Sequence, residues 1–385
     1  MEDSNKIQNL LLFRNIKSIY ILKQIFNNLQ KIKSLYIVNY NKEMQDKLDI
    51  NIEDYKQWSI IEIEIIPIKN EYGKFVKILN KEDEPYYHIY FNDSKEEIKR
   101  YYLTQNDNVE KIKIIIDHKV ESLYKLFFLR NCIESINIKK YYRNNIKNMS
   151  CLFFECPSLK EINFSDFNAE NVTDMSYMFD GCKTLKKVNI STFKTKNIIN
   201  MREMFYGCSS LEEVDLSNFN NNKLNNLTHM FYQCTSLKKV IFTKFNTHNV
   251  IDMSFMFYEC SSLEEINLSS FDTINVINMG KMFYRCSSLK ELDLSNFITD
   301  KVIDMSDMFY NCSSIESINV SNFNTSNVKD MSSMFYSCSS LKEINVSNFK
   351  INSEASIYDM FTNITHELKT KIMNQNNNIN DDAFG

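Results

Sequence analysis

Hydrophobic positions recur along residues 123–361 with a period of 26 residues, and no insertion or deletion interrupts it. A methionine or leucine opens each unit, as at Met201 and Leu227, and a cysteine follows seven positions later. From Cys182 onward a phenylalanine stands three positions before each cysteine. The cysteine column comprises Cys156, Cys182, Cys208, Cys234, Cys260, Cys286, Cys312 and Cys338. A fixed period of this length predicts a solenoid of stacked coils.

Each unit divides into a helical pattern and a strand pattern. In residues 201–208 the apolar side chains recur at i, i+3, i+4 and i+7, which predicts one buried face of a short helix. In residues 211–219 apolar and polar side chains alternate from Val214 onward, which predicts a short strand with one wet face. Residues such as Asp304 precede the helical pattern and can accept the free N–H groups of its first turn.

The period continues beyond the cysteines at both ends, where Arg130 and Ile364 occupy the cysteine column. Degenerate terminal units of this kind are typical of capping repeats. We therefore predict an α/β repeat solenoid over 117–364, with one short parallel strand and one short helix per coil. About ten coils, stacked at about 4.8 Å each, would make a rod roughly 45–50 Å long.

A longer motif, N-V-x-D-M-S-x-M-F-Y-x-C-S-S-L-x-x-[IV]-[ND]-[LV]-S-x-F, is clear in residues 249–271 and 327–349. It resembles the BspA-like leucine-rich-repeat surface proteins of bacteria and protists. The resemblance implies a leucine-rich-repeat fold and a surface or adhesion role. The chain departs from those relatives because no secretion signal, lipoprotein cysteine or membrane anchor is recognisable in it. The relatives' location is therefore not carried over.

Composition argues against several functions. Only 5 Gly and 3 Pro occur in 385 residues, which leaves few tight turns and disfavours phosphate-binding loops. A formal net charge of −4 gives no electrostatic reason for a nucleic-acid partner, and no apolar run is long enough for membrane insertion. The histidines form no repeated or paired constellation: they are His88, His118, His229, His248 and His366. We predict no catalytic residues, no cofactor and no enzyme activity.

The cysteine column does not match a zinc site, because the cysteines occur one per coil without histidine partners. Neighbouring coils would bring cysteine Cα atoms within disulfide range, but stacked side chains point the same way. We expect buried free thiols that pack as small apolar residues, with partial oxidation as the alternative. Free thiols suit a reducing compartment and favour a cytoplasmic location.

The polar strand face is the candidate partner-binding surface. It consists of a charged border, an Asn/Asp column and a Ser/Thr column. These are Glu161, Lys187, Glu213, Lys239, Glu265, Glu291 and Glu343; Asn163, Asn189, Asp215, Asn267, Asp293, Asn319 and Asn345; and Ser165, Ser191, Ser217, Thr243, Ser269, Ser295, Ser321 and Ser347. Such side chains can hydrogen-bond from coil to coil as ladders, so stability alone could explain them. The functional interpretation is a flat or concave docking surface for a protein.

The Asn and Ser columns also create N-x-S sequons, which begin at Asn163, Asn189, Asn267, Asn319 and Asn345. Glycans on neighbouring coils would collide, as at the first two of these positions. The sequons therefore argue against a glycosylating secretory route and favour the cytoplasm.

The segments that flank the solenoid predict three further units. Residues 1–57 predict a helical unit, with a stripe formed by Ile21, Leu22, Ile25, Phe26 and Leu29. Its segments ILKQIFNNLQ and LYIVNYNKEMQ resemble an F-box, a module that recruits a ubiquitin-ligase adaptor, but the usual opening Leu-Pro and later Trp are missing. Residues 58–116 predict a β-rich region that caps the solenoid edge. Residues 365–385 predict a polar, disordered tail.

These features lead to three functional hypotheses. The first is a non-enzymatic scaffold that binds a protein through the strand face. The alternatives are a cell-surface adhesion protein, as the resemblance implies, and a substrate receptor of a ubiquitin ligase that acts through the F-box-like N-terminus.

Overall fold

The computed structural model describes residues 59–385 except 118, 142–144, 165–166, 168, 192, 194 and 220–221, together with 18, 21, 24, 42–48 and 56. Helix α4 (Lys42–Leu48) lies within the predicted N-terminal helical unit. Most of the predicted helical stripe and of the F-box-like segments lies outside the described residues.

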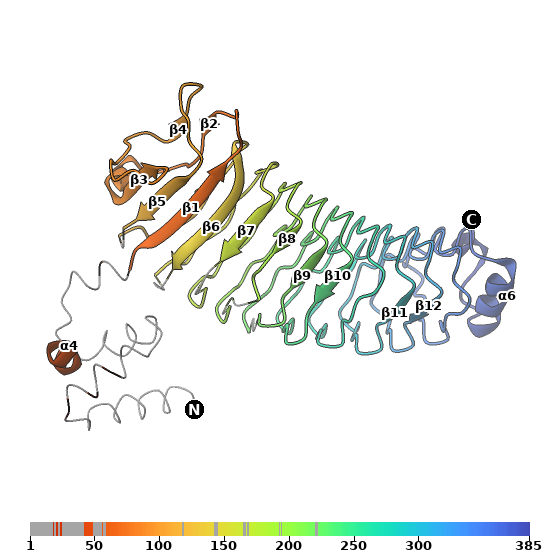
Figure 1. The fold of residues 1–385 in the computed structure, drawn as a ribbon. Helices are drawn as coiled ribbons and strands as arrows, with labels where there is room; N and C mark the ends of the chain where they lie inside the picture. Colours follow the sequence, from red (N-terminus) through yellow and green to blue (C-terminus); the bar gives the residue numbers. More distant parts are fainter. Residues whose placement is uncertain are drawn as a thin grey trace.

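One sheet runs from the N-terminal cap into the first part of a rod-shaped solenoid (Figure 1), with strand order β10-β9-β8-β7-β6-β1-β5-β3. Neighbouring strands from β6 to β10 are parallel and in register, as predicted. Farther along the rod, β11 and β12 form another parallel pair. The bounds are β6 (Ile133–Tyr141), β7 (Glu161–Phe164), β8 (Lys187–Val188), β9 (Glu213–Asp215), β10 (Lys239–Ile241), β11 (Glu291–Asp293) and β12 (Ser317–Asn319).

The solenoid has about seven complete coils, the number of 26-residue intervals between Cys156 and Cys338. The prediction of about ten counted the partial coils at both ends as whole ones. A column of single-residue bridges still joins coil to coil from Ser122 to Ser356, so the register extends into the partial coils.

The predicted helix in each coil is wrong. Residues 201–208 and their equivalents, which we call the turn segments, form consecutive turns. The backbone is left-handed at Glu203 (φ 54°) and at Gly207 (φ 65°), and this pair of positions recurs in the next coil at His229 and Gln233. A left-handed residue interrupts an α-helix, so no helix can run through a turn segment.

The physical reason is the direction of the backbone hydrogen bonds. In an α-helix the N–H groups bond to carbonyls of the same segment. Here the Met201 N–H donates to Asn226 O (3.2 Å) and the Glu203 N–H to Thr228 O (3.0 Å), so the bonds link each coil to the next. The helical spacing of apolar residues nevertheless points them inward: the fully buried ones in this segment are Met201, Met204, Phe205 and Cys208.

The core consists of stacked columns. The phenylalanine before each column cysteine stacks on its equivalent in the next coil, with ring centroids 5.2–5.7 Å apart. The described cysteines are free, and those of the column are buried. Each column thiol donates to a phenylalanine carbonyl of the preceding coil, as Cys208 Sγ does to Phe179 O at 3.0 Å. The expected burial of these thiols is confirmed.

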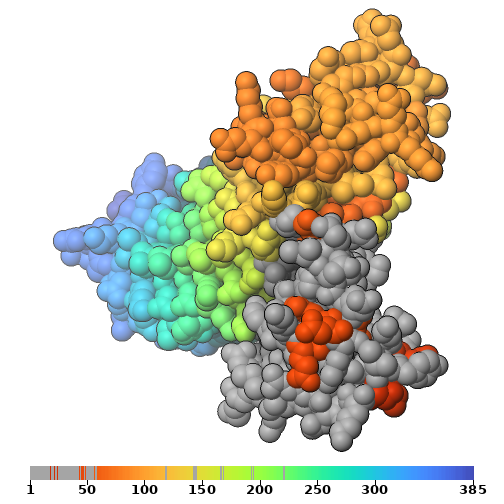
Figure 2. All heavy atoms as spheres, turned by 90° about the vertical axis from the view of Figure 1, so that its left-hand side faces the viewer, coloured from red at the N-terminus to blue at the C-terminus, as the bar shows by residue number. Residues whose placement is uncertain are grey.

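Antiparallel strands cover the first edge of the solenoid. β1 (Ile61–Pro67) pairs with β6 on one side and with β5 (Ile112–Ile116) on the other, and β3 (Tyr87–Phe91) follows β5. The chain also forms β2 (Gly73–Lys74), η1 (Lys81–Tyr86) and β4 (Tyr102–Leu103) here. Figure 2 shows this region in orange at the near end of the rod, with the coils receding behind it from yellow to blue. β1 thus occupies the hydrogen-bonding edge that β6 would otherwise expose.

The predicted disordered tail is instead a second cap. α6 (His366–Gln375) begins after Thr365, whose Oγ1 accepts the Leu368 N–H at 3.2 Å, and η2 (Asp381–Ala383) follows it. The Phe361 N–H of the last coil donates to Ala383 O (2.6 Å). The polar composition of the tail concealed a few apolar residues that pack on the end of the rod: Leu368, Ile372, Ile379 and Phe384. No helix in the described part of the chain is long and apolar enough to cross a membrane.

Candidate functional site

The strand side of the rod carries the candidate partner-binding residues on its surface. Its described border charges and most of its Asn/Asp column are exposed, as are Thr243, Ser269 and Ser347. The half-buried members are Ser191, Asp215, Ser217, Ser295 and Ser321. Ser165 lies outside the described residues. The strand residues between these positions, such as Val214, are buried, so the alternating pattern correctly separated the two sides of the strands.

The Asn/Asp and Ser/Thr columns bond mainly within a coil. Asp215 Oδ1 accepts the Ser217 N–H at 2.8 Å, and Asn319 Oδ1 accepts the Ser321 hydroxyl at 2.8 Å. These contacts form Asx turns, which end the strand and redirect the chain. Coil-to-coil bonding of the predicted kind does occur where Asn319 Nδ2 donates to Asp293 Oδ1 at 3.2 Å. The prediction that these columns hydrogen-bond generally from coil to coil is therefore wrong.

Between residues 186 and 265 the charged border is two residues wide and alternates in sign from coil to coil. Residues 186–187 and 238–239 are lysines, whereas residues 212–213 and 264–265 are glutamates. All eight side chains are described, and none forms an ion pair within the chain. We call these four pairs the charge rows. Nearer the start of the rod, Lys160 at an equivalent position does pair internally, with Glu134 at 2.8 Å.

Hollows lie along the strand side of the described coils. One of about 460 Å³ lies among the side chains of charge rows 238–239 and 264–265 and of residues 290–291. A larger one of about 850 Å³ lies where the strands meet the C-terminal cap, with Glu291, Asp293 and Glu343 on the strands and Lys371 on α6. The face is therefore a series of shallow hollows with both signs of charge.

Stacked tyrosines line the turn segments, a feature that the sequence analysis missed. Their ring centroids are 4.4–4.7 Å apart, and they are Tyr206, Tyr232, Tyr258, Tyr284, Tyr310 and Tyr336. Partial burial raises the pKa of the hydroxyls of Tyr206 and Tyr232. The signal was available, because a tyrosine stands two positions before the cysteine in six consecutive units.

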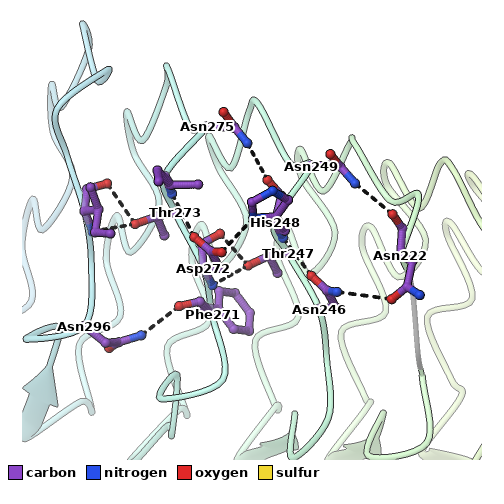
Figure 3. A network of polar contacts seen from close by, with 12 residues as sticks. Asn222, Asn246, Thr247, His248, Asn249, Phe271, Asp272, Thr273, Asn275 and Asn296 are labelled. Atoms are coloured by element: carbon purple, nitrogen blue, oxygen red, sulfur yellow. Dashed lines mark hydrogen bonds and ion pairs between the residues drawn. The ribbon is translucent and has the colours of Figure 1, made fainter.

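Polar side chains join the coils along the link that follows each strand (Figure 3). Thr247 Oγ1 donates to Asp272 O at 2.8 Å and accepts the Asp272 N–H at 2.8 Å, and Asn275 Nδ2 donates to His248 O at 2.8 Å. His248 Nδ1 lies 2.8 Å from Asp272 Oδ2. Partial burial opposes ionisation of Asp272, but the His248 contact and the Ile274 N–H lower its pKa overall. These groups connect neighbouring coils, so we assign them to stability.

The carboxyl of Asp180 lies in the tyrosine column and is only 6% exposed. Burial raises its pKa to about 7, and the nearby carboxylates of Glu203 and Glu155 add to the effect. Gly181 leaves space for the Glu155 carboxyl, because a Cβ at 181 would lie 2.6 Å from its carboxyl carbon. In the described part of the chain, no three metal-binding side chains lie close enough together to hold an ion.

Comparisons with known proteins extend over the solenoid and its C-terminal cap. The family model described as "Mycoplasma protein of unknown function, DUF285" matches residues 121–243, 211–317 and 290–381. No curated protein matches the chain.

Among solved structures, the chain is similar to a leucine-rich repeat protein from Bacteroides ovatus ATCC 8483. The two are 17% identical with a TM-score of 0.34, over 72% of this chain and 80% of that one. It is also similar to a leucine rich cell surface protein from Faecalibacterium prausnitzii A2-165, at 14% identity and a TM-score of 0.20, over 62% of this chain and 85% of that one.

The three family matches overlap and together cover residues 121–381, which is well over half of the chain. They span the same 26-residue units that carry the BspA-like motif. The chain therefore belongs to the family described as "Mycoplasma protein of unknown function, DUF285", whose repeats are of the BspA-like leucine-rich kind.

Proposed function

We propose that this chain is a non-enzymatic scaffold whose strand face binds another protein. The observation that carries the proposal is the set of four charge rows at 186–187, 212–213, 238–239 and 264–265. Their side chains lie at the surface and form no ion pair within the chain. Charged groups arranged in this way can meet opposite charges on a partner, which favours correct orientation and fast association.

The support beneath this face is rigid. Parallel strand pairing, stacked phenylalanines and turn-segment hydrogen bonds connect every coil to its neighbours. A preorganised surface loses little conformational entropy on binding, so modest contacts are sufficient for affinity. The net charge of −4 supports a protein partner over a nucleic acid.

The proposal that the chain is not an enzyme rests on how its reactive groups are used. Burial raises the pKa of the Cys156 and Cys312 thiols to about 12, which suppresses the nucleophilic thiolate. The His248–Asp272 pair lies in the coil-to-coil network described above. Both kinds of group are therefore accounted for by the fold.

Substitution on the strand face tests the binding proposal. In Asn267→Arg with Asn319→Arg, two exposed amides become long cations, which should weaken binding by about tenfold or more at a preorganised interface. Proteins captured by the full chain from cell extract would be identified and quantified by mass spectrometry.

The matched control is Ile251→Lys with Ile303→Lys. These side chains are 49% and 42% exposed, and the same column already carries Lys329. The control should retain every partner. If the strand-face variant also retains every partner, the strand face is not the binding surface.

We propose a cytoplasmic location, with cell-surface adhesion as the second candidate. Asn163 on β7 and Asn189, which directly follows β8, are exposed on neighbouring coils about 4.8 Å apart, where two glycans would collide. The family resemblance favours the surface. Antibody staining of intact and permeabilised cells that express an N-terminally untagged chain separates the two, since staining of intact cells would overturn the cytoplasmic proposal. The ubiquitin-ligase hypothesis depends on residues 1–57 and fails if the full chain retains no adaptor.

A further inference from the structure

We infer that the strand face binds a second copy of the chain, with the two copies related by a two-fold axis parallel to the strands. This inference rests on the proposed binding role of the face and names its partner. The evidence is the order of the charge rows along the rod.

The charge rows set a strict requirement on any partner. Positive rows 186–187 and 238–239 alternate with negative rows 212–213 and 264–265, one coil apart. Successive coils are about 4.8 Å apart, so the sign of the charge reverses about every 4.8 Å along the rod. A partner that neutralises all four rows needs charges that alternate with the same spacing. A second copy of this solenoid meets that requirement, because it carries the same charge rows at the same coil spacing.

The direction of the symmetry axis decides whether the rows attract or repel. In a two-fold dimer each surface patch meets the same patch of the other copy. An axis parallel to the rod would place each row against its own equivalent, which repels. An axis parallel to the strands reverses the coil order. Rows at equal distances on opposite sides of the axis then face each other.

One axis position makes every charge row complementary. With the axis between β9 and β10, row 212–213 faces row 238–239 of the second copy, and row 186–187 faces row 264–265. Each opposition occurs twice by symmetry, so four pairs of opposite rows meet at the centre of the interface.

Shifting the axis by one coil removes part of this match. With the axis between β8 and β9, row 238–239 would face residues 160–161, which are Lys and Glu and carry no net charge. With the axis one coil toward β11, row 212–213 would face residues 290–291, which are Lys and Glu and carry no net charge. The charge order thus selects one register as well as one orientation.

Outside the centre, Lys160 pairs with Glu134 at 2.8 Å, and Lys342 pairs with Glu316. The eight side chains of the charge rows, which the two-fold arrangement brings together, form no such ion pair within the chain. Because exposed ion pairs are individually weak, the association should be reversible. It should also weaken with salt, since the screening length falls from about 10 Å at 0.1 M to about 3 Å at 1 M.

Complementary charge reversal tests the inference. Sedimentation velocity of the full chain between about 1 μM and about 100 μM measures self-association. Two variants are compared with the natural chain: an acidic-face variant, Lys187→Glu with Lys239→Glu, and a basic-face variant, Glu213→Lys with Glu265→Lys. Each variant alone should show a Kd for self-association raised at least about tenfold, because each substituted side chain then faces a like charge in the opposite row. An equal mixture of the two should restore the dimer.

The mixture also controls for folding, since misfolded variants would not recover association. The Ile251→Lys with Ile303→Lys variant adds charge away from the strand side and should dimerise like the natural chain. A natural chain that stays monomeric throughout, or a dimer that both reversals leave intact, would overturn the inference. A monomeric chain that still captures other proteins through the strand face would leave the scaffold proposal standing, so the two failures are distinguishable.

Discussion

Single side chains act here according to the column they occupy. A column cysteine such as Cys208 is fully buried, and its thiol donates to a carbonyl of the preceding coil. Asp180 is buried too, but the same environment disfavours its charged form. The first outcome could be predicted from the sequence, because a regular apolar context implies burial. The second could not, since Glu155 and Glu203 become neighbours of Asp180 only once the coils are stacked.

The raised pKa of Asp180 predicts a pH-dependent cost to stability. Its folded pKa of about 7 exceeds the ordinary value of 3.8, so the folded chain binds more protons between these values. Stability from this group is therefore present at low pH and is lost as pH rises through about 7. Asp180→Asn should stabilise the chain relative to the natural one by up to about 3 kcal/mol more at pH 8 than at pH 5. Urea unfolding at both pH values measures this.

The exposed Ser340, which does not titrate in this range, provides the control. Ser340→Gly should change stability equally at the two pH values. An Asp180→Asn variant whose advantage is the same at pH 5 and pH 8 would contradict the raised pKa.

At the scale of elements, strands were predictable and turn segments were not. A strand is recognised by alternation, which gave the buried and exposed sides of β9 correctly. The i, i+3, i+4, i+7 spacing of a turn segment fits a helix equally well, and only the coil-to-coil direction of the N–H groups decides between them. One signal was present: Gly181, Gly207, Asn311 and Asn363 share a column, and Gly and Asn are the residues that best adopt left-handed φ.

Substitution of Ser333 separates a turn from a helix. Ser333 has φ 53°, and a left-handed residue with a Cβ is strained by about 1–2 kcal/mol. Ser333→Gly should therefore stabilise by about 0.5–1 kcal/mol, whereas Ser333→Val should destabilise by at least about 1 kcal/mol. Within a helix the glycine would instead be destabilising. Thermal unfolding followed by circular dichroism gives the order of the three chains.

Ser340, which is exposed and has no positive φ, is the matched position. Ser340→Gly should be neutral or slightly destabilising. Equal effects of glycine at 333 and 340 would rule out the left-handed assignment.

At the scale of the whole molecule, the rod is closed at both ends by different means. The first edge is paired by strand β1, and the last coil is covered by α6 and η2. The cap at the first edge was predictable, because residues 58–116 contain strand-like runs. The C-terminal cap could not be recognised from the sequence, because α6 contributes only Leu368 and Ile372 to the core, within a polar segment. The average composition of the tail is dominated by its polar residues, so it does not reveal so small an apolar contact.

The C-terminal cap should be needed for stability. Leu368→Ala and Ile372→Ala should each cost about 2–5 kcal/mol, because both side chains are buried against the end of the rod. Met373 is 37% exposed on the same helix, so Met373→Ala should cost less than about 0.5 kcal/mol. Urea unfolding gives the energies, and light scattering reports aggregation through the uncovered end. Equal losses at all three positions would show that α6 does not pack as a cap.

The constant coil length has a consequence for how such a gene can change. Because every coil has 26 residues and meets its neighbours in the same way, recombination between repeats can add or delete whole coils without disturbing either cap. Deleting the coil of row 212–213, however, would bring lysine rows 186–187 and 238–239 side by side. A rod shortened in this way would keep its fold and lose its charge alternation, so repeat number can alter partner choice while the architecture is inherited unchanged.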